Sequence, residues 1–550
     1  MTQKISFRNS KFLYCFAITH EYMENIITIG RGRLLCLEDS KKIARNNAKI
    51  IFSKETFPAM RKSREVLLKF VNNRTPVYGL STQFGNQANF LDDNIKNDDA
   101  DYFHSLRERQ YNLIKSHNIS LGEESPEEVV RSAMLLRAHC LAQGHSGVRP
   151  ETVESLSLFL NKGVHPVVRH YGSIGASGDL IPLSGIAAAL TGEDTHVYYR
   201  RKRMKAIAAL RVAGIKKLQV ELREGLALIN GTSFGTAIAS LAVFDLRRLF
   251  PQMLSAIAMA FESLTIIGSA YNPFVHKLKG HKGEIEVNEF LNEFWDGNRL
   301  IRSLTDVRTE TLSFFESNGN GRGEAKSLQD YYSLRAVPQG FGAFKENLER
   351  SVVWVENEMN AVSDNPVVSM NPEKVYHCAN FMGYYVTEAS DVLKMDIAQA
   401  SSWLHAILAN MVHYRKSSGL PANLVKRPQI HNGFRPLQIL AAALAVQNRK
   451  LAQVQQVFMI PTEGDNQDVN SLATHAAFDL REAVSNLERL TVILLLASAQ
   501  ALELRGIAKA GARARRIVRT IRGKSSFLEA DRPLLEEMEA VTQLLREEKI

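Results

Sequence analysis

Long stretches of helical periodicity dominate the sequence after residue 221. Apolar residues recur there at three- and four-residue spacing over lengths well beyond an average helix. The stretches are 234–269, 338–361, 385–414, 436–459 and 469–505. Helices of this length bury their apolar stripes by packing side by side, which predicts a helical bundle. The most apolar piece, 491–499, is far shorter than the ~18 residues of a membrane span. We therefore expect it in the bundle core or at a subunit interface, and we expect no membrane partner.

The first 220 residues carry a more mixed pattern. Residues 12–18 are typical of an N-terminal strand or arm, and 34–48 of a strand that runs into a charged helix. Helices fit 58–72 and 126–143, the second with Ser125 as N-cap and proline in its first turn. The sequence therefore predicts a mainly α fold with a smaller mixed N-terminal region. We divide it into an N-terminal arm, an N-terminal region with two loops, a central helical bundle and a basic and acidic helical tail, at residues 1–30, 31–220, 221–505 and 506–550.

The composition is that of a globular protein from a reducing compartment. Hydrophobic residues make up 45% of the 550 and charged residues 23%, which excludes disordered and fibrous chains. The cysteines form no C-x-x-C pair, which argues against a zinc ribbon, a disulfide framework or a dithiol centre and favours the cytoplasm. The histidines match no ligand pattern and H-E-x-x-H is absent, so we expect no metal.

The formal net charge of +10 comes in large part from one segment near the C-terminus. Residues 505–524 are rich in lysine and arginine, and acidic residues follow at 529–539. A solvated helix face that pairs with the acidic run explains this pattern better than a nucleic-acid arm, because no aromatic residues are interleaved to stack on bases. We expect no nucleic-acid partner.

Residues 171–191 combine four glycines and three serines with apolar neighbours. Glycines allow turns and close backbone approach that a side chain would forbid. An exposed glycine-serine linker has polar flanks, whereas Leu180, Ile181 and Leu183 follow this one at once. We expect the loop, centred on residues 176–179, to lie inside the fold and to form a functional site.

The tripeptide Ala176, Ser177 and Gly178 is capable of self-modification. In a compressed turn the Gly178 amide nitrogen can attack the Ala176 carbonyl, and loss of two waters leaves a five-membered ring on which Ser177 supplies an exocyclic methylidene. A rigid, desolvated loop is needed to bring the two groups into attack geometry. Alone the tripeptide is common, and a plain loop would be the better interpretation.

In context the stretch GASGDLIPL at 175–183 closely resembles the prosthetic-group signature of the histidine, phenylalanine and tyrosine ammonia-lyases and their 2,3-aminomutase relatives. Five further blocks resemble the same family and follow its order over roughly 31–505: YGLSTQFG at 78–85, EGLALINGT at 224–232, YSLRAVPQ at 332–339, NFMG at 380–383 and NQDVN at 466–470. The resemblance implies the long-helix bundle of the ammonia-lyase and fumarase type.

The resemblance also implies a prosthetic group and a base. Ala176, Ser177 and Gly178 would form 4-methylideneimidazol-5-one, an electrophile that captures the substrate amine and makes it a good leaving group. Tyr78 matches the family's base, which removes the proton on the β-carbon. Because a phenol has a reference pKa near ~10, Tyr78 needs activation by nearby donors or helix N-termini to act at neutral pH.

The remaining matches assign positions around that group. Asn230 and Tyr332 match residues that hold and help build it, donating toward its developing charge as in an oxyanion hole. Arg335 matches the arginine that grips the substrate carboxylate, with Gln329 assisting. Phe381 matches a ring that packs beside the group and the substrate.

The family resemblance leaves the substrate open. Ser116 and His117 fall where the family places its side-chain selector, and a histidine there suits a polar ring, either imidazole or phenol. Gln467 occupies a position that is glutamate in histidine lyases and glutamine in phenylalanine and tyrosine enzymes, and Glu463 also matches the latter group. Histidine, tyrosine and phenylalanine all remain candidate substrates.

One departure from the family concerns the lid that carries Tyr78. Gln83 stands where the family usually has glycine, and loss of that glycine should restrict the lid or require a different turn. A stiffer lid would hold the unsaturated intermediate longer, so we hypothesise re-addition of ammonia at the β-carbon, which is aminomutase activity.

Other classes fit less well, and the assembly follows from the resemblance. A serine hydrolase needs G-x-S-x-G, but Asp179 stands two residues after the serine. A fumarase-type eliminase has a different serine-glycine loop, whereas a catalytically inactive interaction protein on a lyase fold stays open because of Gln83. Lyases of this family are homotetramers whose active sites take residues from several chains, so we expect a homotetramer with D2 symmetry.

Overall fold

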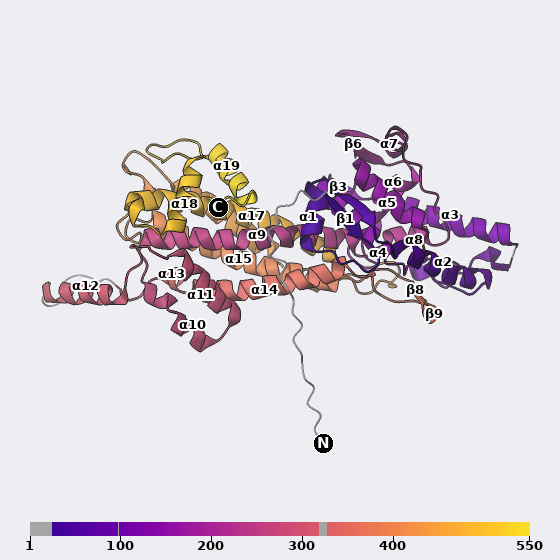
Figure 1. The fold of residues 1–550 in the computed structure, drawn as a ribbon, viewed down its shortest axis with the longest axis horizontal. Helices are drawn as coiled ribbons and strands as arrows, with labels where there is room; N and C mark the ends of the chain where they lie inside the picture. The colour runs from indigo at the N-terminus through magenta and orange to yellow at the C-terminus, as the bar shows by residue number, and fades with distance from the viewer. Residues whose placement is uncertain (1–24, 97, 318–326) are drawn as a thin grey trace, which may run out of the picture.

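Five long helices form the centre of the protein. The structure, a computed structural model, describes residues 25–96, 98–317 and 327–550. The helices are α9 (Ser233–Leu264), α14 (Val337–Met359), α15 (Tyr384–Val412), α16 (Arg435–Leu451) and α17 (Ala473–Arg505). Figure 1 shows α9, α14, α15 and α17 side by side along the long axis. The predicted bundle and mainly helical fold are confirmed, although α16 ends at Leu451 rather than near 459 because the chain turns away there.

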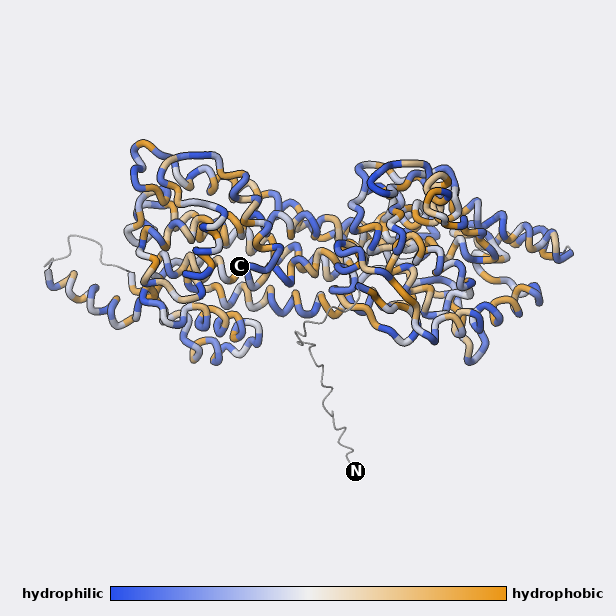
Figure 2. The backbone as a smooth tube through the Cα atoms, turned by 45° about the horizontal axis from the view of Figure 1, so that its top comes forward, coloured by the Kyte–Doolittle hydropathy of each residue, from blue (hydrophilic) through white to orange (hydrophobic). Residues whose placement is uncertain are grey.

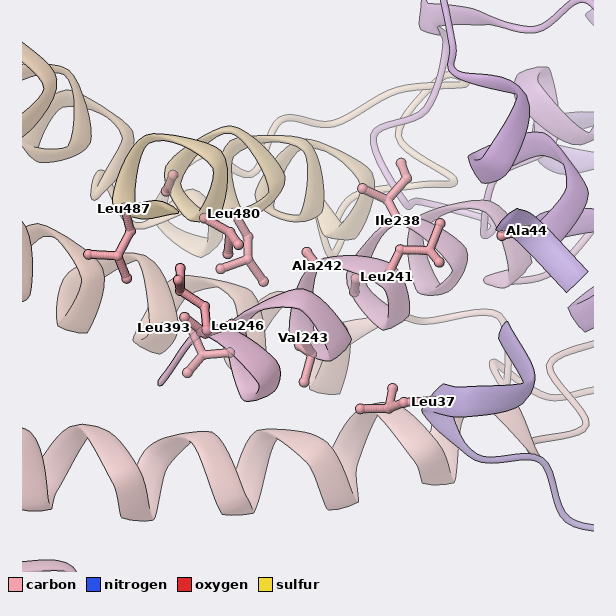
Figure 3. Packing of buried hydrophobic residues seen from close by; sticks show 14 of the residues in the cluster. Leu37, Ala44, Ile238, Leu241, Ala242, Val243, Leu246, Leu393, Leu480 and Leu487 are labelled. Carbon is pink, nitrogen blue, oxygen red and sulfur yellow. The ribbon is translucent and has the colours of Figure 1, made fainter. Parts of the chain in front are cut away.

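The bundle is held together by a continuous apolar core. Leu246 of α9, Leu393 of α15 and Leu480 of α17 are fully buried and lie together in the centre of Figure 3. Burial of one such side chain contributes about 1.5–3 kcal/mol. The apolar stretch 491–499 is buried throughout, as predicted. Figure 2 shows hydrophobic and hydrophilic residues following one another along these helices.

The N-terminal region gathers at one end of the bundle. Its helices are α1 (Leu37–Arg45), α2 (Thr56–Asn72), α3 (Asp99–His117), α4 (Glu127–Ala142), α5 (Pro150–Lys162), α6 (Leu180–Thr191), α7 (Ala206–Ala213) and α8 (Glu224–Ile229). Its strands are β1 (Ile26–Ile29), β2 (Lys49–Phe52), β3 (Leu121–Glu124), β4 (Val164–Pro166), β5 (Arg169–Tyr171), β6 (His196–Tyr199) and β7 (Lys202–Lys205), and the hairpin β8 (Val367–Met370) with β9 (Glu373–Tyr376) joins them there.

The small sheets correct two predictions. The strand expected at the start of 34–48 is wrong: Leu34 is exposed, and β1 pairs in parallel with β2 across α1 instead. The N-cap of α4 is Pro126 rather than Ser125, because the Ser125 amide donates to the Val168 carbonyl (2.7 Å) and keeps the chain extended. The predicted strand at 12–18 lies outside the described residues.

The opposite end of the bundle carries short helices from two separate parts of the sequence, 273–335 and 512–546. They are α10 (Pro273–Lys279), α11 (Lys282–Phe294), α12 (Leu304–Ser317), α13 (Tyr332–Arg335), α18 (Ala512–Arg522) and α19 (Leu535–Arg546). The basic α18 differs from the prediction in its ion pairs, since Arg522 pairs with Glu503 of α17 (2.6 Å) and Arg513 lies 3.6 Å from Glu293 of α11. In the described parts of the chain, no helix has the length and hydropathy needed to cross a membrane.

Candidate active site

The loop that carries residues 176–178 runs from β5 to α6 and is pinned by the segment that precedes α17. The Leu472 amide donates to the carbonyl of Ile174 (2.9 Å), next to the tripeptide. Ala176 is 5% exposed and Ser177 is half-buried. The loop therefore lies inside the fold, as the sequence predicts, with the serine hydroxyl facing a partly open space.

The backbone of this loop touches the segment between α8 and α9. Gly178, with φ of +66°, pairs with Gly231, and a Cβ at position 178 would overlap the Gly231 backbone. Only glycine fits this approach. One residue earlier in that segment, Asn230 Nδ2 donates to Ser177 Oγ (2.9 Å). Asn230, Ser177 and Gly178 are thus brought together within one chain. We call these residues, with Ala176, the loop cluster.

Asp179 fixes the loop to the bundle, a role that the sequence analysis missed. Its carboxylate accepts hydrogen bonds from the amides of Phe234 (3.0 Å) and Gly235 (2.8 Å) in the first turn of α9, and from the hydroxyls of Ser173 (2.8 Å) and Thr474 (2.5 Å). An anion at a helix N-terminus is stabilised by the helix dipole. Burial raises the pKa of Asp179, while the four donors oppose that rise.

One buried polar atom of the loop cluster has no protein partner. Asn230 is 1% exposed, yet its Oδ1 accepts no hydrogen bond from the described residues. A buried amide oxygen without a partner is costly unless a bound group donates to it. Asn230 Nδ2 donates to Ser177 Oγ, so the side chain can hold an acceptor on a group built on Ser177. Over the described residues, no set of three or more acidic, histidine or cysteine side chains is placed to bind a metal ion.

Tyr78 lies in the loop between α2 and α3 and is tied to the same region. The Gly79 carbonyl accepts from Gln110 Nε2 of α3 (2.9 Å), and Gln110 Oε1 accepts from the Leu226 amide of α8 (2.9 Å). Because α8 ends directly before Asn230, this tie places Tyr78 at the end of the bundle that holds the loop cluster.

The electrostatics of Tyr78 differ from the expectation. Burial raises its pKa; the Gly85 amide, which donates to the phenol oxygen (3.0 Å), lowers it, and the Glu463 carboxylate raises it. The net shift is upward, whereas the sequence analysis expects activation. The groups of a single chain therefore do not activate this phenol.

Gln83 is accommodated without a left-handed turn. Its amide donates to the Phe90 carbonyl (3.0 Å), next to the bridge between Thr82 and Leu91, and its φ lies outside the left-handed region. Arg109 of α3 donates to the Thr82 carbonyl (3.1 Å) as well. The lid of this chain is a short hairpin on α3 in which position 83 does not require glycine.

The proposed selector residues lie at the end of α3. Ser116 Oγ is 3.0 Å from His117 Nδ1, and the His117 carbonyl accepts from Ser184 Oγ of α6 (2.6 Å). Since α6 begins directly after Asp179, this bond places the pair beside the helix that follows the loop cluster. Ser116 is exposed and His117 half-buried in the isolated chain.

Three further predicted residues lie at this same end. Glu463 lies so close to Gly85 that a Cβ there would overlap its carboxylate. Gln467 accepts from Thr462 Oγ1 (2.8 Å) in the segment that leads to α17. Phe381, half-buried, comes two residues before Gly383, where an added Cβ would crowd against residues 232, 471 and 473. All three therefore belong to elements that surround the loop cluster.

Gln329, Tyr332 and Arg335 form a separate group, which we call the arginine cluster. Arg335 Nη1 donates to Gln329 Oε1 (2.5 Å), and its guanidinium carbon lies 4.6 Å from the centre of the Tyr332 ring. Tyr332 is 75% exposed. The cluster rests on the bundle through Trp403, whose indole N–H donates to the Ser333 carbonyl (2.8 Å).

The arginine cluster and the loop cluster lie at opposite ends of the bundle. The first turn of α9 binds Asp179, whereas Ile267, just after its last turn, donates its amide to Asp330 (2.6 Å). The 32 residues of α9 at 1.5 Å each put about 48 Å between the two ends. Figure 1 shows α13 at one end and α8 at the other. Within one chain, Tyr332 and Arg335 do not reach Ser177.

Two buried polar pairs support the site and have no signal in the sequence. Arg223 and Asp364, both fully buried, form a bidentate pair (2.8 and 2.9 Å) before α8. Glu358 accepts from Thr232 Oγ1 (2.5 Å), two residues after Asn230, and burial raises its pKa. Partners this far apart along the chain cannot be paired from residue spacing.

Comparison with known proteins places this architecture in a family. The family model for aromatic amino acid lyases matches residues 35–523. The chain is 34% identical to histidine ammonia-lyase of Geobacillus sp. (strain WCH70), over 94% of this chain and 96% of the relative. The protein belongs to the aromatic amino acid lyases and is a carbon–nitrogen lyase.

Solved structures give the same fold. Tyrosine aminomutase from Streptomyces globisporus superposes with a TM-score of 0.88 at 29% identity, covering 95% of this chain and 97% of that one. Histidine ammonia-lyase from Trypanosoma cruzi superposes with a TM-score of 0.83 at 29% identity, covering 95% and 94%. The fold is therefore similar to that of both lyases and aminomutases.

Proposed function

We propose that this lyase eliminates ammonia from an aromatic L-amino acid by means of a 4-methylideneimidazol-5-one ring formed from Ala176, Ser177 and Gly178. The observation that carries the proposal is the close contact of Gly178 with Gly231. Backbone held this tightly in a buried loop favours attack of the Gly178 nitrogen on the Ala176 carbonyl. Folding has already brought the two groups together, so the attack itself loses little further entropy.

The residues around the loop fit such a ring. Once formed, the ring would supply the electrophile that captures the substrate amine. Asn230 Nδ2, which donates to Ser177 Oγ (2.9 Å), would donate to the ring carbonyl, and Asp179 would keep the loop on α9.

The intact mass tests ring formation. We expect the wild-type chain to weigh two waters less than its sequence, whereas Ser177→Ala has no hydroxyl to eliminate and can lose at most one water, from ring closure. An unmodified wild-type chain would overturn the proposal and favour a catalytically inactive protein on the lyase fold.

In this proposal the substrate lies between Tyr78 and Arg335. Tyr78 takes the β-proton, Arg335 grips the carboxylate with the help of Gln329, Tyr332 donates toward the developing charge, and Phe381 packs beside the ring. The phenol must first lose its proton, which burial and Glu463 oppose. A guanidinium brought close by assembly would favour the phenolate. The base therefore depends on the assembled enzyme.

We propose a homotetramer in which each active site joins the loop cluster of one chain to the arginine cluster of another. An antiparallel pair of bundles brings opposite ends together, so a two-fold axis completes two sites at once. Large exposed apolar side chains on the outer faces support such packing: Val353 on α14, Tyr385 and Met395 on α15, and Ile439, Leu440 and Val446 on α16. A monomer at micromolar concentration in light scattering would contradict it.

For the substrate we propose a polar ring, with L-histidine ahead of L-tyrosine. The relative from Geobacillus is a histidine ammonia-lyase, and His117 can bond to either imidazole or phenol. Gln467 and Glu463 keep tyrosine and phenylalanine open. Turnover of L-histidine, L-tyrosine and L-phenylalanine, with identification of the products, shows which substrate side chain the enzyme prefers. Preference for L-phenylalanine would reject the proposal of a polar substrate ring.

Aminomutase activity is the second candidate, favoured by the hairpin of the lid. Its hydrogen bonds at Gln83 and Arg109 would slow opening and keep the unsaturated acid in place for re-addition of ammonia. Only the α,β-unsaturated acid from the preferred substrate, with no β-amino acid at any time, would reject this candidate.

We also propose a cytoplasmic location. Cys36, Cys140 and Cys378 are free thiols in the described chain, which is the usual state in a reducing compartment. Fractionation of cells that express the native gene tests this, and a secreted protein would contradict it.

A further inference from the structure

A polar cavity of about 210 Å³ opens on the N-terminal region, outside both clusters. Its walls come from the end of α3, from β5 and from the β6–β7 hairpin. The lining side chains that carry hydrogen-bond donors are Asn118, Ser120, Arg169, Thr195, His196 and Arg203. Such a density of donors without an apolar floor is suited to a small, strongly polar ligand.

Much of this donor capacity is unused. Among the described residues, no hydrogen bond joins the side chains of Asn118, Thr195 or His196 to the protein, although Thr195 is only 8% exposed. The main chain of two of them is used in the hairpin: His196 pairs with Lys205, and the Thr195 carbonyl accepts from the Ala206 amide (2.9 Å). The side chains are therefore left to face the cavity.

The positive charges that line the cavity are only partly neutralised by acidic side chains. Arg169 and Arg203 share one carboxylate, Glu124, at 3.5 and 3.4 Å, which is long for charge-assisted hydrogen bonds. The acidic residue on the rim, Asp194, is 85% exposed at its side chain and paired with Lys205 (2.5 Å). Two guanidinium groups against one shared carboxylate leave a net positive site.

Neighbouring groups add to this potential. Arg200, Arg201 and Lys202 form the exposed turn of the same hairpin. Burial and then the charges of Arg203 and Lys205 lower the pKa of His196, with smaller opposing effects from nearby carboxylates. A bound anion would act in the opposite direction and favour the imidazolium, which would then donate to it.

We propose that this cavity binds a small multivalent oxyanion, a ligand that bears a phosphate or two carboxylates. The volume lies below the ~300–1,000 Å³ of pockets for larger organic ligands. Arg203 provides the fork geometry that phosphate and carboxylate prefer, and Arg169, which already donates to the Gly122 carbonyl (2.7 Å), adds its positive charge. Asn118 directly follows His117, so a bound anion lies one residue from the substrate selector. That consequence, unlike the binding itself, rests on the proposed function.

Calorimetry on the full-length enzyme tests the proposal, with inorganic phosphate and succinate as separate probes and chloride holding the ionic strength constant. Arg203→Gln should weaken binding about tenfold or more, because a charge-assisted bond is lost. Arg203 is 40% exposed and its ion pair with Glu124 of β3 is long and shared with Arg169, so this variant should fold. Arg211→Gln, an exposed cation of α7 that does not line the cavity, removes the same charge and should bind normally.

Each possible result of the titrations either supports or contradicts the anion site. Binding of phosphate, succinate or both that depends on Arg203 supports the site and identifies the ligand class. No heat beyond the chloride control, or equal weakening by Arg211→Gln, overturns it in favour of diffuse surface charge. Repeating the titration with Ser177→Ala, which cannot complete the prosthetic ring, keeps a failure of the proposed function distinct from a failure of the anion site.

Discussion

The loop cluster and the arginine cluster differ in what the single chain does for them. The loop cluster is buried and anchored by four donors to Asp179 from three separate segments, whereas Tyr332 is 75% exposed and Arg335 contacts neighbours within six residues of itself. The first is completed by folding. The second is presented at a surface, which is the arrangement expected of a group that acts on a partner chain.

The largest expected effect tests the buried cluster directly. Gly178→Ala places a Cβ into the Gly231 backbone at a φ of +66°, so the loop must open and the ring should not form. We expect activity to fall by on the order of 10⁴-fold or more, as when a group essential to the chemistry is removed. Intact mass should show that the two waters are retained.

Gly185→Ala is the matched control for this variant. Position 185 lies in α6 of the same stretch, and its added Cβ would make ordinary contacts of 3.5 Å or more. Ring formation and activity should survive. Equal loss in both variants would mean that any change in this stretch is disruptive, and the special role of the Gly178 approach would be lost.

The next largest effect concerns the contribution of each end of the bundle to the stability of the fold. Asp364→Asn leaves the fully buried Arg223 without its ion partner, which should destabilise the fold by about 3–5 kcal/mol. Tyr332→Phe at the exposed cluster should change stability by less than about 0.5 kcal/mol. Thermal unfolding of both variants makes the comparison. Similar losses would contradict the distinction between a buried and a presented cluster.

Mixing two inactive variants tests whether the clusters meet between chains. If Ser177→Ala and Arg335→Ala subunits are co-assembled, half of the sites have an intact loop and half of those an intact arginine, so about a quarter of the activity should return. Ser177→Ala mixed with Asn230→Ala should recover nothing, because both changes lie in one cluster. Recovery in the control pair, or none in the first, would refute the shared site.

The smallest expected effect concerns the pH profile. If Tyr78 acts as the base in its phenolate form, as proposed, its raised pKa means that kcat/KM should rise with pH through that pKa. Glu463→Gln removes a charge that raises the pKa, so the rising limb should move to lower pH. Glu373→Gln, an exposed carboxylate paired with Lys69 outside the site, should leave it in place. A rising limb that moves to higher pH in Glu463→Gln would refute this electrostatic account.

The bundle and the interior loop could be predicted because both depend on local patterns. Apolar spacing located the long helices, and the apolar flanks of residues 171–191 placed their loop inside. The strand expected at the start of 34–48 and the Ser125 cap failed because both were decided by residues that follow later in the chain: β2, which pairs with β1, and Val168. The upward pKa shift of Tyr78 depends on burial, which a motif does not report.

The sequence by itself determined a mainly helical fold and, within a glycine-rich loop, a tripeptide capable of cyclisation, since apolar periodicity and the positions of glycines are local properties of the chain. Only the tertiary structure decided that Asp179 ties this loop to α9 and that Arg335 lies a helix length away from Ser177. The physical reason is that hydrogen bonds and separations of this kind are set by how long helices pack, and they leave no trace in residue spacing.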